Sequence, residues 1–500
     1  MKRILILTVL AVVLLLAISA TTFAQSSARS YIITASGNKL PTNLEAKVKA
    51  AGGVLDTRMD GIGLAVATSS APNFAKKLEK TAGIRSVVPN LTLQWIDPDR
   101  TVVELEPDAG NPPISGDDDF FFDLQWGHDA VDAPEAWEAG ARGAGVRVAV
   151  LDTGFDLDHP DLAPNINMAL SADMTGEGLG YTLPDPFSHG THVAGTIAAA
   201  DNAFGTIGVA PEAELVLVKV LSDAGSGSFE DVIEGILYAA DADADVINMS
   251  LGAAIYKNGD PNDPDGPYTA REAQELKNAI ARAVAYAHKN GTTVITSAGN
   301  AANDGDHDKA LIHIPSDAPQ AISIAATAPI GWAVDPLNTF LDNPASYTNF
   351  GQSVIDFAAP GGDAAYPGNE NCLIAGLVRP CWVFDLVFST GSNLNPALAS
   401  YYWSAGTSMA APHASGVAAL IIGANGGDMA PAQVEAALRA SADDLGKPGN
   451  DDFYGAGRVN AHNYFEESSH PPLNRMYEKR LAPGASLFYF PCNSPLSSVS

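Results

Sequence analysis

Apolar positions occur along most of the chain in short runs that alternate with longer Ala- and Gly-rich segments. The run 146–151 is almost wholly apolar and β-branched, whereas segments 193–200 and 409–422 have the length and small residues of tightly packed helices. Strands that are apolar throughout are typical of parallel sheets covered on both faces. The pattern therefore predicts an α/β fold in which helices flank a parallel sheet.

A smaller unit precedes this region, at residues 25–97. Its pattern predicts a strand at 31–34, a helix at 43–51, a strand at 62–67, a helix at 73–81 and a further strand from residue 87. Short strands and helices that alternate over so few residues predict a small α+β sandwich. A length of 500 residues also indicates more than one domain.

The first 24 residues have the three parts of a signal peptide. A charged start, Met1-Lys-Arg, precedes fifteen mainly apolar residues, 4–18, and small residues end at Ala24. A membrane anchor is the alternative, but a spanning helix needs about 20 apolar residues. The pattern therefore predicts cleavage and secretion of an extracellular protein that keeps no stable membrane anchor.

Residues 98–122 are rich in Asp, Glu, Pro and Gly and predict an exposed acidic linker that buries little. Charge is distributed unevenly, because residues 26–96 carry a net +5 in a chain whose total is −30. Opposite charges predict electrostatic docking of the N-terminal unit on the acidic remainder. The alternative is that these positive charges are lysines on a solvated helix face, which would give the same net charge without docking. The negative charge weighs against nucleic acid as a partner.

Three short motifs contain an acid, a base and a nucleophile. They are Asp152-Thr-Gly, His189-Gly-Thr-His-Val-Ala-Gly and Gly406-Thr-Ser-Met-Ala-Ala-Pro. A serine hydroxyl needs an imidazole to take its proton, and the imidazole needs a carboxylate to hold one tautomer. Ser408, His189 and Asp152 would fill these roles. Asp152 directly follows the predicted strand 146–151, and functional groups of α/β folds gather at such carboxyl ends.

The motifs resemble the signature blocks of the subtilisin-like serine peptidases, or subtilases, and the likeness runs over residues 123–465. Ser297-Ala-Gly-Asn300 is similar to the family segment that supplies the oxyanion amide, which implies that Asn300 donates its NH₂ there. The resemblance implies a subtilisin-like fold and a monomeric endopeptidase that cuts polypeptides through an acyl-enzyme. It also implies that residues 25–97, notably 83–90, form an inhibitor-type propeptide of a self-processing zymogen that is cut between residues 97 and 123.

Substrate contacts follow from the same resemblance. It implies two strand-like walls that pair with an extended peptide, together with the primary pocket. The residues concerned are Gly225, Ser226 and Gly227 on one wall, Ser250, Leu251 and Gly252 on the other, and Ser297, Ala298 and Gly299 at the pocket. The glycines also fit ordinary loop positions. Ala301 brings no charge to the pocket, so a neutral or broad preference is our hypothesis.

A structural calcium site is a further implication of the resemblance. The ligands would be the side chains of Asp161 and Asn202 and the carbonyls of Ala200, Phe204 and Thr206. Calcium takes ~6 to 8 oxygen ligands from groups of these kinds. Asp and Asn are also common turn residues, which is the alternative.

The three cysteines lie late in the chain. Cys372 and Cys381 are nine residues apart, and export to an oxidising compartment favours a disulfide between them over two unpaired thiols. Cys492 is left over. Residues 466–500 form a C-terminal tail beyond the likeness to the family, and the sequence gives it no role.

Three alternative functions meet specific objections. A non-catalytic relative should lack one of the four catalytic residues, yet Asp152, His189, Asn300 and Ser408 are all present. An α/β-hydrolase esterase should contain Gly-x-Ser-x-Gly and the order Ser, acid, His, and this chain has neither. A sedolisin-type acid peptidase would use a glutamate base and an aspartate at the oxyanion position, which His189 and Asn300 disfavour.

Overall fold

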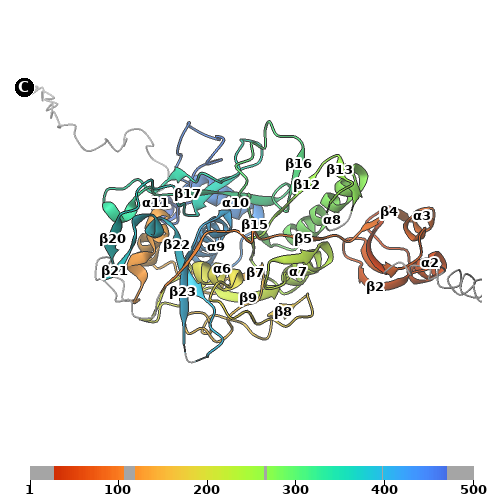
Figure 1. The fold of residues 1–500 in the computed structure, drawn as a ribbon, viewed down its shortest axis with the longest axis horizontal. Coiled ribbons are helices and arrows are strands. Elements are labelled where there is room, and N and C mark those ends of the chain that lie inside the picture. The colour runs from red at the N-terminus through yellow and green to blue at the C-terminus, as the bar shows by residue number, and fades with distance from the viewer. Residues whose placement is uncertain (1–27, 106–118, 264–266, 397, 470–500) are drawn as a thin grey trace, which may run out of the picture.

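The computed structural model describes residues 28–105, 119–263, 267–396 and 398–469, so the predictions for residues 1–24 and 470–500 lie outside the described residues. Figure 1 shows a small unit, drawn in red and orange, beside a much larger α/β part. A single stretch of chain, residues 92–105, leads from the small unit across the larger one.

The larger part is built on an eight-stranded sheet in the order β18-β17-β15-β11-β7-β9-β8, with β19 paired to β17. All of its strand pairs are parallel except β17 with β18. The strands are β7 (Arg147–Asp152), β8 (Ala172–Asp173), β9 (Glu214–Lys219), β11 (Val246–Met249), β15 (Thr293–Ser297), β17 (Ala321–Ala328), β18 (Asn343–Pro344) and β19 (Phe357–Pro360). The predicted strand 146–151 is β7, and the predicted parallel sheet is present.

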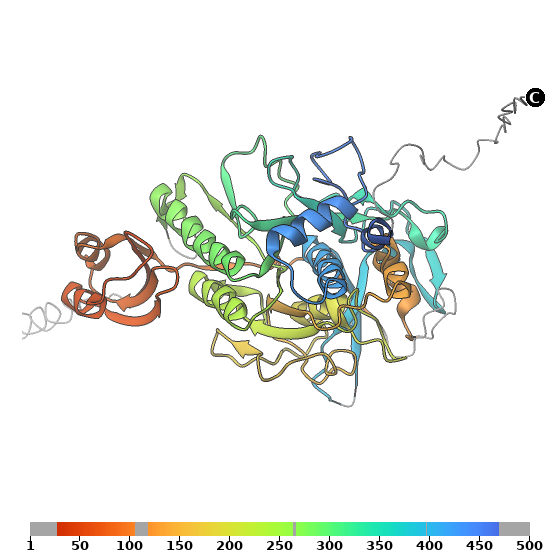
Figure 2. The ribbon, with the colours of Figure 1, turned by 180° about the vertical axis from the view of Figure 1, so that it is seen from behind.

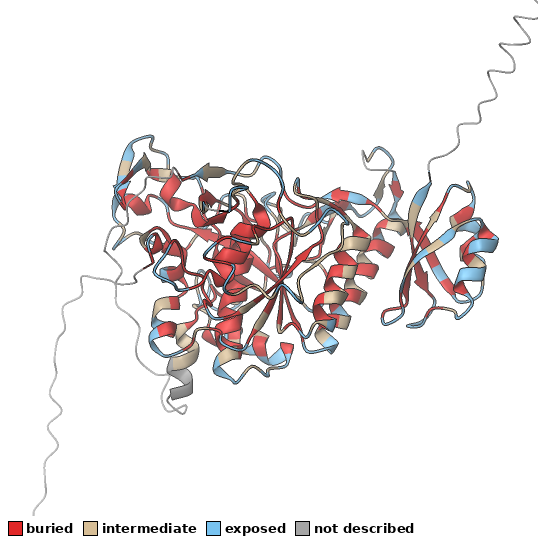
Figure 3. Cartoon of the chain, turned by 90° about the horizontal axis from the view of Figure 1, so that it is seen from below, coloured by how far each residue is buried: buried red, intermediate tan, exposed pale blue. Residues whose placement is uncertain are grey.

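Alternate residues of the central strands belong to different hydrophobic clusters, because successive side chains point to opposite faces of a sheet. In β7, Val148 and Val150 pack on the face of α6 (His189–Ala198) and α9 (Thr407–Ala424). Ala149 and Leu151 pack with α7 (Phe229–Asp241) and α8 (Ala270–Lys289) on the other face. Buried residues accordingly fill the sheet and the facing sides of these helices (Figure 3).

Both helices that carry catalytic motifs begin earlier than the sequence pattern predicts. Helix α6 starts at His189 because Ser188 caps it, its side chain accepting a hydrogen bond from the Thr191 amide. Helix α9, blue in Figure 2, starts at Thr407 and runs through the middle of the larger part. Among the described residues, α9 alone is long and apolar enough to cross a membrane by length and composition, and 83% of it is buried inside the fold.

The N-terminal unit has a four-stranded antiparallel sheet, in the order β2-β3-β1-β4, with two short helices. Its elements are β1 (Arg29–Ala35), α2 (Leu44–Ala51), β2 (Val54–Met59), β3 (Leu64–Ser69), α3 (Phe74–Glu79) and β4 (Ile84–Pro89). The sequence pattern predicts all of them except β2. This edge strand alternates exposed and half-buried residues and ends on one buried residue, so it lacks an apolar run.

The N-terminal sheet packs against α7 and α8. Ile32 and Val66 share a hydrophobic cluster with Ile233 of α7 and Leu276 of α8. At the edge of this contact, the side chains of Arg85 and Ser86 donate hydrogen bonds to the carboxylate of Glu275, at 3.1 and 2.9 Å. Apolar burial and a few polar contacts therefore hold the unit in place. The three lysines of the 73–81 segment are exposed: Lys76, Lys77 and Lys80.

The prediction that residues 98–122 form an exposed linker is wrong for its described ends. Strand β6 (Val102–Glu104) pairs with β23 (Ser400–Ser404), and Leu105 is buried in the main core. At the other end, Phe121 and Phe122 are buried in the same core. Local composition misses these contacts because the partners come from a segment about 300 residues later in the chain.

The remaining elements surround the sheet. They are β5 (Thr92–Gln94), η1 (Phe122–Leu124), α4 (Trp126–Ala130), α5 (Ala133–Glu138), β10 (Ser226–Ser228), β12 (Ala253–Tyr256), β13 (Gly259–Asp260), β14 (Tyr268–Thr269), β16 (Leu311–Ile314), η2 (Trp332–Val334), β20 (Asn371–Ile374), β21 (Leu377–Pro380), η3 (Cys381–Asp385), β22 (Val387–Gly391), α10 (Pro431–Ser441) and α11 (His462–Ser469). A disulfide joins Cys372 in β20 to Cys381 at the start of η3.

Candidate active site

The three motifs meet at the carboxyl edge of the sheet. Asp152 is the last residue of β7, His189 is the first residue of α6, and Ser408 is the second residue of α9. Asn300 follows β15 at the same edge, three residues beyond the end of the strand. Parallel strands align their carboxyl ends, which is why residues so far apart in sequence gather here.

Asp152 and His189 form a buried hydrogen-bonded pair. Nδ1 of His189 lies 2.7 Å from Oδ1 of Asp152, and both side chains are almost completely buried. The Thr153 amide also donates to Oδ1, at 2.7 Å, and fixes the carboxylate at the strand end. This geometry holds the imidazole in the tautomer that carries its proton on Nδ1 and leaves Nε2 as the acceptor.

The hydroxyl of Ser408 donates to the carbonyl oxygen of Ser250, at 3.0 Å, instead of to His189. Nε2 of His189 is buried and has no hydrogen-bond partner among the described residues. The acid–base half of the site is thus formed, whereas the bond from the nucleophile to the base is not. Such bonds often form only when a substrate is bound.

Asn300 and the start of α9 place two donors beside the same space. Oδ1 of Asn300 accepts hydrogen bonds from the amide and the hydroxyl of Thr407, at 2.9 and 2.8 Å. These bonds orient the amide group, so its NH₂ is left for another acceptor. A Cβ added at Gly406 would lie 3.4 Å from Nδ2 of Asn300 and 3.6 Å from the amide nitrogen of Ser408. The Ser408 amide lies in the first turn of α9, where no carbonyl within the helix can accept from it.

Residues 92–96 lie in the groove that leads to Ser408. Strand β5 pairs antiparallel with β10, which matches Gln94 with Ser226 and Leu93 with Gly227. On the other side, the Gly252 amide donates to the carbonyl of Trp95, at 3.0 Å. The segment is therefore held between the two walls that the sequence predicts, 225–227 and 250–252.

Trp95 anchors this segment. Its side chain is buried, donates from Nε1 to the carbonyl of Gly227 at 2.8 Å and packs edge-on against Phe229. The neighbouring apolar residues Leu91 and Leu93 belong to the same cluster. The sequence analysis missed this occupant of the groove, although Leu91, Leu93 and Trp95 alternate with polar residues as in a strand.

A cavity of about 210 Å³ opens beside Ser408. Its lining residues are Trp95, Ile96, Asp97, Gly252, Ala253, Ala254, Ser297, Ala298, Gly299, Asn300, Ala301, His313, Ile314, Ser316, Asn349, Thr407 and Ser408. The predicted pocket segment Ser297–Gly299 thus lines the cavity that Ser408 borders. His313 and Ser316 bring polar groups to this cavity from a part of the chain that the sequence analysis did not assign to it.

A buried lysine supports the loop after Asp152. Nζ of Lys219, at the end of β9, donates to Oδ1 of Asp223 at 2.5 Å, and the same oxygen accepts from the Gly154 amide at 3.2 Å. Burial alone would raise the pKa of Asp223, but hydrogen bonds from Lys219 and Thr182 lower it below its usual value. The sequence analysis assigns Lys219 no role, but a lysine at the end of an apolar strand is the pattern that could have pointed to it.

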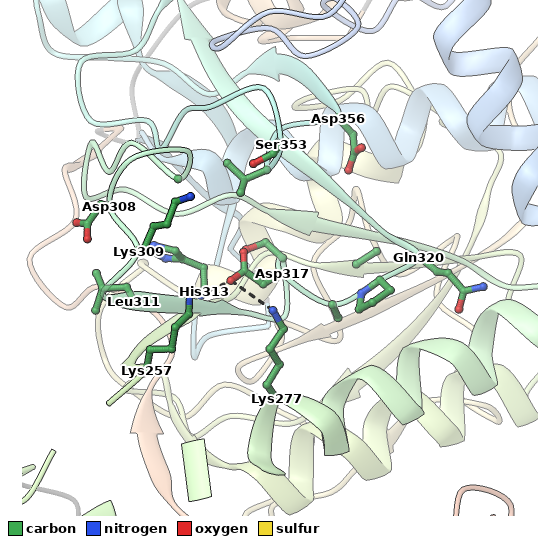
Figure 4. Close-up of a pocket in the computed structure, with 16 residues that line it drawn as sticks. Lys257, Lys277, Asp308, Lys309, Leu311, His313, Asp317, Gln320, Ser353 and Asp356 are labelled. Carbon is green, nitrogen blue, oxygen red and sulfur yellow. Dashed lines mark hydrogen bonds and ion pairs between the residues drawn. The ribbon is translucent and has the colours of Figure 1, made fainter. Parts of the chain in front are cut away.

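A second cavity, of about 540 Å³, lies beyond His313 and Ser316. Figure 4 shows that Lys257, Lys277 and Lys309 surround it, and Lys277 pairs with Asp317 at 3.8 Å. Its other acidic groups, Asp308 and Asp356, balance the remaining lysines. Its lining includes His313, Ser316 and Asp317 but neither Ser408 nor Asn300, so the cavity beside Ser408 is the candidate active site.

The predicted calcium ligands come together only in part. The backbone amide of Thr206 donates to Oδ2 of Asp161 at 2.9 Å, and the side-chain nitrogen Nδ2 of Asn202 lies 3.5 Å from Oδ1 of Asp161. The Ala200 amide donates to the carbonyl of Asp161, at 2.7 Å. The Phe204 amide instead donates to Asp119, at 3.0 Å.

In these hydrogen bonds, donors rather than oxygens face the carboxylate of Asp161. Its Oδ2 also accepts from the hydroxyl of Tyr401, at 2.9 Å, and burial raises the pKa of Asp161 to about 7. No group of three or more His, Cys, Asp or Glu side chains in the part of the chain that the structure describes is arranged to hold a metal. Calcium stays a prediction. We expect a higher melting temperature in excess calcium than in a chelator, and equal melting temperatures would contradict the predicted site.

Stability should fall in mild acid because His413 is buried without charge. Nδ1 of His413 donates to the Met409 carbonyl at 2.8 Å, Nε2 has no partner among the described residues, and burial lowers the pKa to about 4. A histidine in the unfolded chain takes up a proton near pH ~6.5. Between about pH 6.5 and 4 the unfolded state therefore binds more protons than the folded state, and the free energy of unfolding decreases as the pH is lowered. We expect His413 to contribute up to roughly 3 kcal/mol to this fall.

The measurement is urea unfolding at several pH values in the Ser408→Ala background, which prevents self-digestion. His413→Gln should flatten the slope of stability against pH, whereas His307→Gln, at a side chain that is 85% exposed, should leave it unchanged. Equal slopes for His413→Gln and its parent would contradict the assignment.

Comparisons with known proteins agree with this geometry. A model of the subtilase family matches residues 143–457. Thermitase of Thermoactinomyces vulgaris is 32% identical over 352 residues, which cover 69% of this chain and 97% of thermitase. Subtilisin Savinase of Lederbergia lenta is 34% identical over 340 residues, which cover 68% and 97% of the two chains.

Solved structures extend the likeness of fold. The epidermin leader peptide processing serine protease of Staphylococcus aureus superposes with a TM-score of 0.67 at 21% identity, over 89% of this chain and all of that one. Fervidolysin of Fervidobacterium pennivorans, a keratinolytic enzyme, superposes with a TM-score of 0.64 at 23% identity, over 91% of this chain and 62% of fervidolysin. Both likenesses cover more of the chain than the family match does. This chain belongs to the subtilase family of serine peptidases, and the predicted subtilisin-like fold is confirmed.

Proposed function

We propose that this subtilisin-like serine endopeptidase is made as a secreted, self-processing zymogen, active as a monomer, in which Asp152, His189, Ser408 and Asn300 carry the chemistry. The observation that carries the proposal is the segment 92–96, which lies between β10 and Gly252 as a peptide substrate would. Such strand addition lets main-chain hydrogen bonds hold any polypeptide, while side-chain pockets select among them.

The first half of the reaction forms an acyl-enzyme. Ser408 Oγ turns from Ser250 to His189, gives its proton to Nε2 and attacks the carbonyl carbon of the substrate. Asp152 holds Nδ1–H and stabilises the imidazolium. The negative oxygen accepts hydrogen bonds from Nδ2 of Asn300 and the Ser408 amide. The C–N bond then breaks as Nε2–H protonates the leaving amine.

The second half restores the enzyme. A water molecule gives a proton to Nε2 of His189 and attacks the acyl carbon, and the same two donors hold the oxyanion. The ester bond to Ser408 breaks, and its oxygen takes the proton back from His189. No metal takes part in either half, because every proton passes through His189.

The N-terminal unit would act as an intramolecular inhibitor. Its sheet packs on α7 and α8, and the segment that follows fills the groove up to Asp97. A substrate cannot enter while Trp95 and Ile96 occupy the walls of the cavity. Removal of this unit is therefore the step that would open the site.

Secretion rests on residues 1–24 alone, whose signal-peptide pattern lies outside the described residues. The relatives do not decide it, since one of them, 36% identical over 300 residues, is the major intracellular serine protease of Bacillus subtilis. A disulfide between Cys372 and Cys381 is compatible with an oxidising compartment.

The test is expression of the full chain with its Ser408→Ala counterpart, followed by casein hydrolysis and N-terminal sequencing. We expect the wild type to digest casein and to begin between residues 97 and 123. The variant should do neither and should begin near residue 25. Casein hydrolysis by Ser408→Ala would contradict the assigned nucleophile, whereas an active protein that begins near residue 25 would contradict the zymogen.

A further inference from the structure

The cavity beside Ser408 has a histidine in its wall that the reaction does not use. This residue, His313, lies in β16, which pairs antiparallel with β12, and the register sets it opposite Ala254. Strand β12 begins directly after Gly252, the last residue of one groove wall. The backbone that would hold a peptide in the groove therefore also places His313 at the cavity.

Asn349 fixes the protonation of the His313 ring in its neutral form. The Oδ1 atom of Asn349 accepts hydrogen bonds from the amides of Ala301 and Asn303, at 3.1 and 3.0 Å. Its Nδ2 donates to the Ala298 carbonyl at 2.8 Å, so the side-chain amide has one orientation. In this orientation Nδ2 lies 3.5 Å from Nδ1 of His313. Because Nδ1 faces a donor, the neutral ring carries its proton on Nε2.

The Nε2–H group of His313 is available to a ligand. It has no hydrogen-bond partner in the part of the chain that the structure describes, and it is not one of the buried atoms left unpaired there, as Nε2 of His189 is. Among the described lining residues from Gly252 to Ser408, only His313 can change its charge between pH 5 and 8. This ring is therefore the group through which the cavity can recognise a charged side chain.

Charged groups surround His313 from the second cavity (Figure 4), since His313 and Ser316 line both cavities. The charged side chains that share a cavity with the ring are Lys257, Lys277, Lys309, Asp308, Asp317 and Asp356 of the larger part and Asp97 of the N-terminal segment. Burial lowers the pKa of His313, and the charges of Asp317 and Asp308 partly oppose this effect. The ring is therefore neutral at pH 8 and takes up a proton only below about pH 6.5.

We propose that His313 is a specificity-determining residue, which donates from Nε2 to the side-chain carboxylate of an acidic residue that precedes the cleaved bond. The proposal rests on the proposed endopeptidase function and differs from the neutral or broad preference that Ala301 alone suggests. A carboxylate accepts from both forms of the ring, and its hydrogen bond is stronger when the ring is charged. Selection of acidic residues over their amides therefore increases as the pH is lowered.

The test uses the active protein obtained from the full chain and two peptides that differ only in Glu or Gln before the cleaved bond. Between pH 8 and pH 5 this Glu stays largely charged, and titration of His189 affects both peptides alike. The ratio of kcat/KM for the Glu peptide to that for the Gln peptide therefore reports on His313. We expect the ratio to rise roughly tenfold from pH 8 to pH 5, because a charged hydrogen bond replaces a weaker one. A constant ratio would overturn the proposal.

Two variants show which group causes the change. His313→Gln keeps a donor and cannot be charged, so its ratio should not vary with pH, whereas His307→Gln, at a side chain that is 85% exposed, should behave as the parent. Each ratio is taken within one preparation, so a smaller folded fraction does not alter it. A tenfold rise that persists in His313→Gln would contradict the proposal, as would casein hydrolysis without cleavage of the Glu peptide.

Failure of the parent to hydrolyse casein or either peptide would instead reject the proposed endopeptidase function, so the two failures are distinguishable.

Discussion

Replacing His189 with alanine will lower kcat for peptide hydrolysis by roughly 10⁶-fold, the loss known for the subtilisin triad. Without Nε2 the Ser408 proton lacks its base, because the one hydrogen bond of Oγ in the described part of the chain goes to the Ser250 carbonyl, which accepts no proton. Measured on protein from which the N-terminal unit has been removed, the loss should fall on kcat rather than KM, since the groove walls 225–227 and 250–252 stay in place.

His307→Ala is the matched control for this substitution. The side chain of His307 is 85% exposed and pairs only with Asp304, so its loss should leave kcat within twofold. Both variants are compared with the parent on one peptide, and their melting temperatures are measured alongside. Activity of His189→Ala within tenfold of the parent, in a folded protein, would reject His189 as the base.

Replacing Asn300 with alanine should lower kcat by about 10² to 10³-fold with little change in KM, as for the corresponding subtilisin donor. Its NH₂ borders the same space as the Ser408 amide, so it should bind the oxyanion more tightly than the ground-state carbonyl. The remaining activity reflects the second donor, the Ser408 amide.

Asn300 also accepts two hydrogen bonds from Thr407, so alanine removes a structural contact along with the donor. Asn300→Asp separates the two effects, because its carboxylate keeps the acceptor for Thr407 and has no NH₂. We expect it to be at least as slow as Asn300→Ala at neutral pH, with a melting temperature closer to the parent. Recovery of kcat in Asn300→Asp would show that the asparagine acts by positioning Thr407.

The sequence predicts the positions of the candidate catalytic residues in the fold because each stands beside a strong local signal. Asp152 ends an apolar strand, and His189 and Ser408 open Ala-rich helices, so their places at the carboxyl edge follow from the fold class. Helix α6 begins at His189, four residues before its apolar segment, because Ser188 caps it there.

Features that depend on distant partners could not be predicted in the same way. Val102–Glu104 is flanked by acidic and proline-rich sequence, and its strand exists because β23 offers an edge from about 300 residues away. Strand β2 is likewise an edge strand with little buried surface. The hydroxyl of Tyr401, 240 residues away in sequence, donates to the carboxylate of Asp161, a contact that the local sequence likewise does not predict.

The most direct measurement of the central claim is mapping of the residue labelled by a fluorophosphonate. The probe reacts with a serine only where a base and an oxyanion site activate it. Mass spectrometry of the processed wild-type protein should find the label on Ser408, and neither Ser408→Ala nor His189→Ala should be labelled. Label on another residue, or equal labelling of Ser408→Ala, would contradict the account.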